Sequence, residues 1–151
     1  ITETSLMENA EFMENILSLM SDLGLEIAVD DFGTGYSSLS YLKRLSIDML
    51  KIDQSFVREL PHNNHDTAIC RAIIAMAHNL NIKVLAEGVE NEEQMEFLRK
   101  ENCDEMQGYL YSKAISADEI SVMIDQGFWH TINSSSNHTT TIAADTKAIK
   151  P

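Results

Sequence analysis

Short apolar runs alternate with stretches of helical periodicity over most of this 151-residue chain. Residues 27–29, 48–53 and 82–86 are typical of buried strands, and a weaker run at residues 103–106 predicts a fourth. Apolar residues recur at helical spacing in residues 6–20, 36–45 and 69–80, and capping boxes at Asn91 and Ser116 predict two more helices. This alternation predicts a parallel sheet covered by helices, either as an open doubly wound sheet or as a (β/α)8 barrel.

Polar residues stand where each predicted strand ends. They are Asp30 and Asp31, Lys51 and Asp53, Glu87 and Glu90, and Gln107. The carboxyl ends of parallel strands meet at one rim, where α/β enzymes carry their functional residues. Chance could place one or two charges there, since strand ends meet water. Four consecutive strands with such ends favour a functional site.

The adjacent carboxylates of Asp30 and Asp31 come directly before a glycine-rich turn. Two neighbouring charges at a buried strand end repel each other, and a hard divalent cation such as Mg²⁺ or Mn²⁺ relieves that repulsion. In isolation, the simpler interpretation is that one Asp caps the next helix and the other is solvated. With the downstream charges, metal-assisted hydrolysis of a phosphate ester is the better hypothesis. Lys51 could then orient water or hold a phosphate oxygen, although a solvated strand-end lysine is the alternative.

The composition of the chain limits which partners it can bind and in which compartment it can work. The net charge of −13 argues against binding a nucleic acid polymer or an anionic membrane surface. Cys70 and Cys103 form no zinc pattern and are predicted to be core thiols in a reducing compartment, the cytoplasm. No apolar run is long enough to span a bilayer. Because the chain starts at Ile1, we expect it to be a piece of a longer polypeptide, which could itself be tethered to a membrane.

Residues 1–128 are expected to form one domain. From about residue 131 the sequence turns to Ser, Thr, Asn and small residues without periodicity. This composition predicts a flexible polar tail over residues 129–151.

Five segments resemble, in order and spacing, the EAL family of bacterial cyclic di-GMP phosphodiesterases. They are residues 1–5, 30–39, 50–53, 86–90 and 107–109. The Asp-Asp-Phe-Gly-Thr-Gly-Tyr string from Asp30 is the most specific of them. The resemblance implies a TIM-like (β/α)8 barrel, of which this chain would form about the C-terminal half, because a whole barrel needs about 250 residues.

The resemblance also implies residue roles and partners. The roles are metal binding by Asp30, Asp31 and Glu87, catalysis by Lys51 and Glu87, loop support by Glu3 and Glu90, and substrate binding by Gln107. The substrate would be cyclic di-GMP, cleaved to the linear dinucleotide with Mg²⁺ or Mn²⁺. A homodimer through the region after the Asp30–Asp31 loop, residues 36–45, is a further expectation.

Departures from the family pattern leave two hypotheses open. The Glu-Ala-Leu motif, an upstream arginine and a metal-binding asparagine are absent, and another metal-binding glutamate would fall just before Ile1. In the first hypothesis the parent EAL domain is the enzyme and this chain alone is inactive. In the second, the chain is a non-catalytic module that acts in dimerisation or protein interaction.

Overall fold

The computed structural model describes residues 1–8, 10–35 and 42–125. The chain divides into two compact units, residues Ile1–Lys113 and Ala114–Pro151. In the second unit, the described part contains the helix α7 (Ala117–Asp125). The predicted domain boundary at residues 128 and 129 and the predicted tail lie outside the described residues, as do residues 36–41 of the predicted short helix and dimer region.

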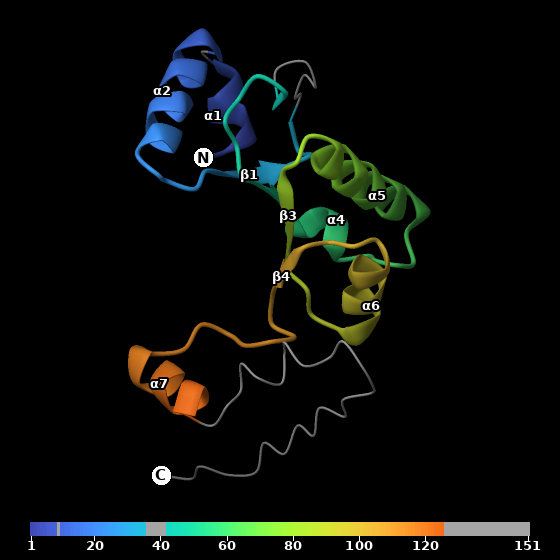
Figure 1. Ribbon diagram of the computed structural model, residues 1–151. Helices are drawn as coiled ribbons and strands as arrows, with labels where there is room; N and C mark the ends of the chain where they lie inside the picture. Colours follow the sequence, from blue (N-terminus) through green and yellow to red (C-terminus); the bar gives the residue numbers. More distant parts are fainter. Residues whose placement is uncertain (9, 36–41, 126–151) are drawn as a thin grey trace, which may run out of the picture. The chain divides into compact units, whose positions relative to one another are not determined.

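The first unit contains a four-stranded parallel sheet in the order β1-β2-β3-β4. Figure 1 labels β1, β3 and β4. The strands are β1 (Ala28–Phe32), β2 (Met49–Ile52), β3 (Lys83–Glu87) and β4 (Glu105–Gln107). Each strand pairs with the next one along the chain, without the reversal of order that defines a doubly wound sheet. The order is therefore that of a barrel segment, and the four predicted strands are confirmed.

Helices precede the first strand and connect β2 to β3 and β3 to β4. In the first unit the described ones are α1 (Glu3–Glu8), α2 (Ala10–Asp22), α4 (Gln54–Val57), α5 (Asn64–Asn79) and α6 (Glu92–Lys100). The helix predicted at residues 69–80 begins earlier, because Asn63 caps it by accepting from the backbone of His65 and Asp66. The capping box predicted at Asn91 is confirmed, with Gln94 as its second member.

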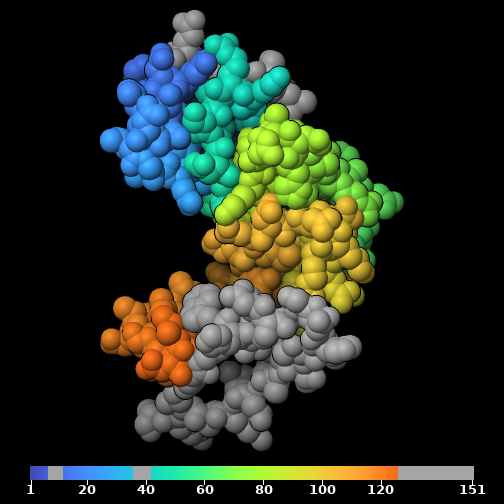
Figure 2. Space-filling model, in the orientation of Figure 1, coloured from blue at the N-terminus to red at the C-terminus, as the bar shows by residue number. Residues whose placement is uncertain are grey.

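The two faces of the sheet differ in burial. Leu50 and Ile52 of β2 and Val84 and Ala86 of β3 are fully buried, whereas the residues between them are half-exposed. Side chains alternate between faces along a strand, so the buried set shares one face and Lys51 and Glu87 share the other. Helices α5 and α6 lie on one side of the strands, and their atoms adjoin each other in the space-filling view (Figures 1 and 2).

Both cysteines are free and buried in this core, as predicted. Burial raises the pKa of Cys70 to about 12 and that of Cys103 to about 11, so both thiols stay protonated at neutral pH.

None of the described helices combines the length and apolar character that a bilayer crossing requires.

Candidate functional site

Asp30 and Asp31 occupy an irregular part of β1. The pairing with β2 is regular at Val29, opposite Leu50, but resumes at Phe32, opposite Ile52, so β1 holds one extra residue there. Asp31 takes up the irregularity with a left-handed backbone, φ 55°. In a regular strand the two side chains would point to opposite faces. The bulge instead lets both carboxylates approach the same point.

Lys51 joins two strand ends by ion pairs. Its Nζ lies 2.8 Å from Oδ1 of Asp30 and also contacts Oε1 of Glu87. The hydrogen bond from Lys51 is the main reason that the pKa of Asp30 lies below its usual value. Burial alone would lower the pKa of Lys51, but the hydrogen bonds to Asp30 and Glu87 outweigh it and raise that pKa. Asp30 and Lys51 are therefore both charged at neutral pH.

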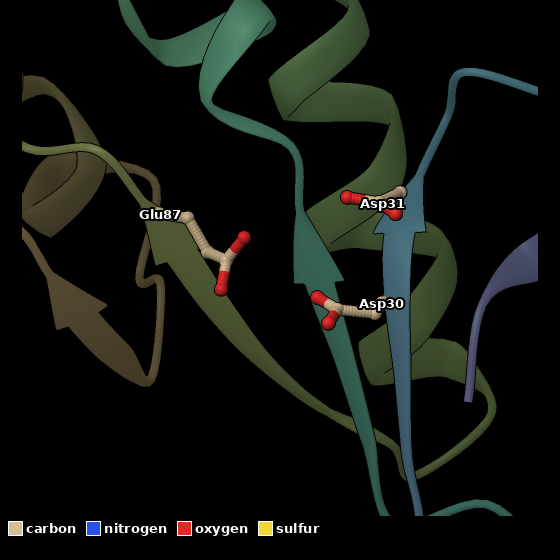
Figure 3. Close-up of side chains that lie close together, drawn as sticks. All are labelled: Asp30, Asp31 and Glu87. Atoms are coloured by element: carbon tan, nitrogen blue, oxygen red, sulfur yellow. The ribbon is translucent and has the colours of Figure 1, made fainter.

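Three carboxylates converge at this rim of the sheet (Figure 3). One oxygen each of Asp30, Asp31 and Glu87 lies within 4.8 Å of the other two. Among the residues that the structure describes, this is the one such group of metal-ligating side chains. Three carboxylate oxygens with one ammonium to balance them suit a hard divalent cation such as Mg²⁺, Mn²⁺ or Ca²⁺. The sequence predicted these three residues, and the structure brings them together.

Glu3 reaches the glycine-rich turn from the start of α1. Its side chain is almost fully buried, and Oε2 accepts hydrogen bonds from the backbone N–H groups of Gly33 (2.9 Å) and Gly35 (3.2 Å). A Cβ at Gly35 would lie 2.9 Å from Oε1 of Glu3, so a larger residue there would push the Glu3 carboxylate aside. Thr2 pairs with Asp30 beside β1 and thereby places Glu3 next to the turn.

Backbone contacts fix the loop that follows Glu87. Gly88 has φ 72°, and Val89, which is fully buried, donates its N–H to the carbonyl of Gln107. The N–H of Leu110 in turn donates to the carbonyl of Val89. A Cβ on Gly108 would lie 2.1 Å from that carbonyl oxygen, so the two backbones touch. The backbone at the end of β4 therefore lies in direct contact with the backbone that follows β3 and holds it in place.

The remaining predicted site residues lie around this loop. Gln107 pairs with Glu87 across β3 and β4 and has an exposed side chain. Glu90 is exposed and is not a member of the carboxylate group found among the described residues; its N–H donates to Oε1 of Gln94. Three features were not predicted from the sequence. They are the bulge in β1, the contact between Gly108 and Val89, and the hydrogen bonds of Gln94 beyond the helix cap, which include one to the carbonyl of Arg58. Of these, Gln94 alone left a sequence signal, the capping box.

A shallow depression of about 410 Å³ lies at the opposite ends of the strands. Its lining includes His78, Lys83 and Asp104, and Nε2 of His78 lies 2.8 Å from Oδ2 of Asp104. Lys83 begins β3, whereas Glu87 ends it. The depression is therefore separate from the carboxylate group, and the chemistry of the carboxylates makes them the better candidate site.

Comparisons with known proteins agree with this geometry. A family model described as the EAL domain matches residues 1–114. The cyclic di-GMP phosphodiesterase NbdA of Pseudomonas aeruginosa is 48% identical over 115 residues, which are 76% of this chain and 15% of that protein. The solved structure of the PaMucR phosphodiesterase in complex with c-di-GMP has a TM-score of 0.77 at 47% identity, over 80% of this chain and 49% of that one.

A metal-containing structure is also similar. Klebsiella pneumoniae BlrP1 in its manganese and cyclic di-GMP complex has a TM-score of 0.68 at 34% identity, covering 74% of this chain and 29% of that one. The chain thus spans about half of the solved PaMucR chain and less than a fifth of NbdA. The residues that the family model matches include all four strands and the carboxylate group.

Proposed function

The chain belongs to the EAL domain family, with a partial TIM-type barrel, and we propose that its parent domain hydrolyses cyclic di-GMP to the linear dinucleotide. The convergence of Asp30, Asp31 and Glu87 within 4.8 Å carries this proposal. Relatives named as cyclic di-GMP phosphodiesterases support the substrate, and the manganese complex of BlrP1 supports a divalent metal. We propose Mg²⁺ or Mn²⁺ as the ion in this protein.

The proposed roles follow from position. Asp30, Asp31 and Glu87 would hold the metal, which, when bound, supplies a water of lowered pKa and neutralises phosphate oxygens. Lys51 carries a positive charge between two of these carboxylates and would hold a phosphate oxygen or orient the attacking water. Glu87 would also accept a proton from that water, since its carboxylate contacts Lys51 and lies on the same face of the sheet.

Supporting residues complete the proposed site. Glu3 would steady the glycine-rich turn through its two backbone hydrogen bonds, and Glu90 would support the loop after β3. Gln107, exposed beside Glu87, would contact the substrate. We assign residues 1–128 to the EAL part and residues 129–151 to a tail, and we place the protein in the bacterial cytoplasm because both cysteines are free thiols.

A non-catalytic module is the second candidate for the chain by itself. Three carboxylates are few ligands for a two-metal site, and the chain spans about half of the solved PaMucR chain. Such a module could act in protein interaction, or as a homodimer through residues 36–45, most of which lie outside the described residues.

We therefore expect the 151-residue chain to bind Mn²⁺ but to hydrolyse cyclic di-GMP at a negligible rate. Isothermal titration calorimetry would measure the affinity for Mn²⁺. Chromatographic separation of the cyclic and linear dinucleotides would measure turnover. Mn²⁺ binding without turnover supports a site that the rest of the parent domain completes. Turnover that Asp30→Asn abolishes would show that the chain is an enzyme by itself, and absence of any Mn²⁺ binding would contradict the metal site.

Lys51→Met should have opposite effects on binding and on catalysis. Removing the ammonium leaves three carboxylates without their counter-charge, so we expect Mn²⁺ to bind about tenfold more tightly. Turnover of the parent domain should nevertheless fall, because no cation would then hold the phosphate or the water. Lys83→Met, which removes the same charge from the other end of β3, is the control and should leave both unchanged. Weaker Mn²⁺ binding in Lys51→Met would mean that Lys51 holds the carboxylates in place.

A further inference from the structure

Gln94 is a buried side chain that the proposed reaction does not use. It lies on α6 with 2% of its surface exposed. Its Oε1 accepts from the N–H groups of Glu90 (2.7 Å) and Asn91 (3.2 Å), and its Nε2 donates to the carbonyl of Arg58 (3.0 Å). The Arg58 bond goes beyond helix capping, because it joins α6 to a residue 36 positions earlier in the chain.

Arg58 ends the helix that follows the strand of Lys51. Helix α4 begins directly after β2, where Asp53 caps it, and closes at Arg58. Its first residue, Gln54, packs so closely on Gly88 that a Cβ there would lie 2.6 Å from Cβ of Gln54. The loop after Glu87 is thus held against α4 at two points, at Gly88 by packing and at Glu90 through the amide of Gln94.

We propose that Gln94 is a positioning residue that holds residues 87–90 against α4 and so fixes Glu87 relative to Lys51. This inference rests on the proposed function for its effect on the metal, but not for its effect on the loop. An amide suits the position because it must accept from one loop and donate to the other. A carboxylate of the same shape can accept both N–H bonds but would face the carbonyl of Arg58 without a proton to donate.

The test compares Gln94→Glu with Asn91→Asp in the 151-residue chain at pH 8. Both variants add one negative charge at the start of α6, but Asn91→Asp keeps the oxygen that accepts from the Gln94 N–H. The test uses pH 8 because it lies well above the usual pKa of a glutamate, and the two backbone N–H groups favour the ionised form of Gln94→Glu. Gln94→Asn serves as a second variant, since it keeps the amide but is too short to bridge both partners. Circular dichroism confirms that each variant is folded.

Two readouts separate the loop from the metal. Hydrogen exchange of the Val89 amide, which donates to the Gln107 carbonyl, reports loop opening without any metal. We expect exchange about tenfold faster in Gln94→Glu and Gln94→Asn, and unchanged in Asn91→Asp. We also expect the dissociation constant for Mn²⁺ to rise about tenfold in the first two variants and to stay within about twofold in the third.

The outcomes distinguish the two proposals. Equal Val89 exchange in Gln94→Glu and Asn91→Asp overturns the positioning role, whatever the metal does. Faster exchange with unchanged Mn²⁺ affinity overturns the link from Gln94 to Glu87. A wild-type chain that binds no Mn²⁺ contradicts the proposed function, and the exchange rates then decide the loop contact by themselves.

Discussion

Replacing Asp30 by Asn is expected to weaken Mn²⁺ binding to this chain by about 100-fold or more. Asp30 supplies one of the three carboxylate oxygens that lie within 4.8 Å of one another. Asparagine preserves the size of the side chain but removes the charge, and hard divalent cations depend on anionic oxygens. Loss of a residue that only supports a metal ligand already costs 10- to 100-fold in affinity, so loss of a ligand should cost more.

The control for Asp30→Asn is Asp22→Asn, at the exposed end of α2. It lowers the net negative charge by the same amount, so it measures how much of the affinity comes from the overall charge of −13. Isothermal titration calorimetry at moderate salt gives the Mn²⁺ dissociation constants of both variants. Circular dichroism checks that both are folded. Equal, small losses in the two variants would mean that Mn²⁺ binds diffusely to an acidic surface and that the carboxylate group is no specific site.

The sequence predicted the four strands and the residues at their ends, because both depend on local patterns. Alternation of apolar runs and helices gives a parallel sheet, and the end of a strand is where its polar residues begin. The sequence therefore predicts that Lys51 and Glu87 lie at one rim of the sheet. The structure adds that they share a face and pair with each other. In the register of β2 and β3, Lys51 lies opposite Leu85, which is two residues before Glu87, so the side chains of Lys51 and Glu87 fall on the same face.

The features that the sequence did not predict depend on contacts between distant segments. The bulge at Asp30 and Asp31 is visible only in the register of β1 against β2, because the same letters could form a regular strand. The capping box identified Gln94 as a helix residue, but its bond to Arg58 comes from a separate helix. Gly108 resembles any turn glycine until the backbone of Val89 is placed beside it.

Replacing Gly108 by Ala should destabilise the fold by about 2–4 kcal/mol. The new Cβ would lie 2.1 Å from the carbonyl oxygen and 2.3 Å from the nitrogen of Val89. Both are backbone atoms of a fully buried residue, so no side chain can rotate away to make room. Relief requires the end of β4 to move away from β3, which breaks the bonds that Val89 makes to Gln107 and Leu110.

Gly24→Ala provides the matched contrast for Gly108→Ala. Gly24 has φ 77°, but a Cβ there meets nothing within 4 Å, so this variant carries backbone strain without a clash. We expect it to cost about 1–2 kcal/mol, the usual penalty for a side chain in the left-handed region. Urea denaturation measures the free energy of unfolding of both variants, and Mn²⁺ titration shows whether Glu87 has moved. Similar losses of stability in the two variants, with Mn²⁺ affinity retained, would contradict this prediction. They would mean that the contact between Gly108 and the Val89 backbone relaxes easily and does not hold the loop that follows Glu87.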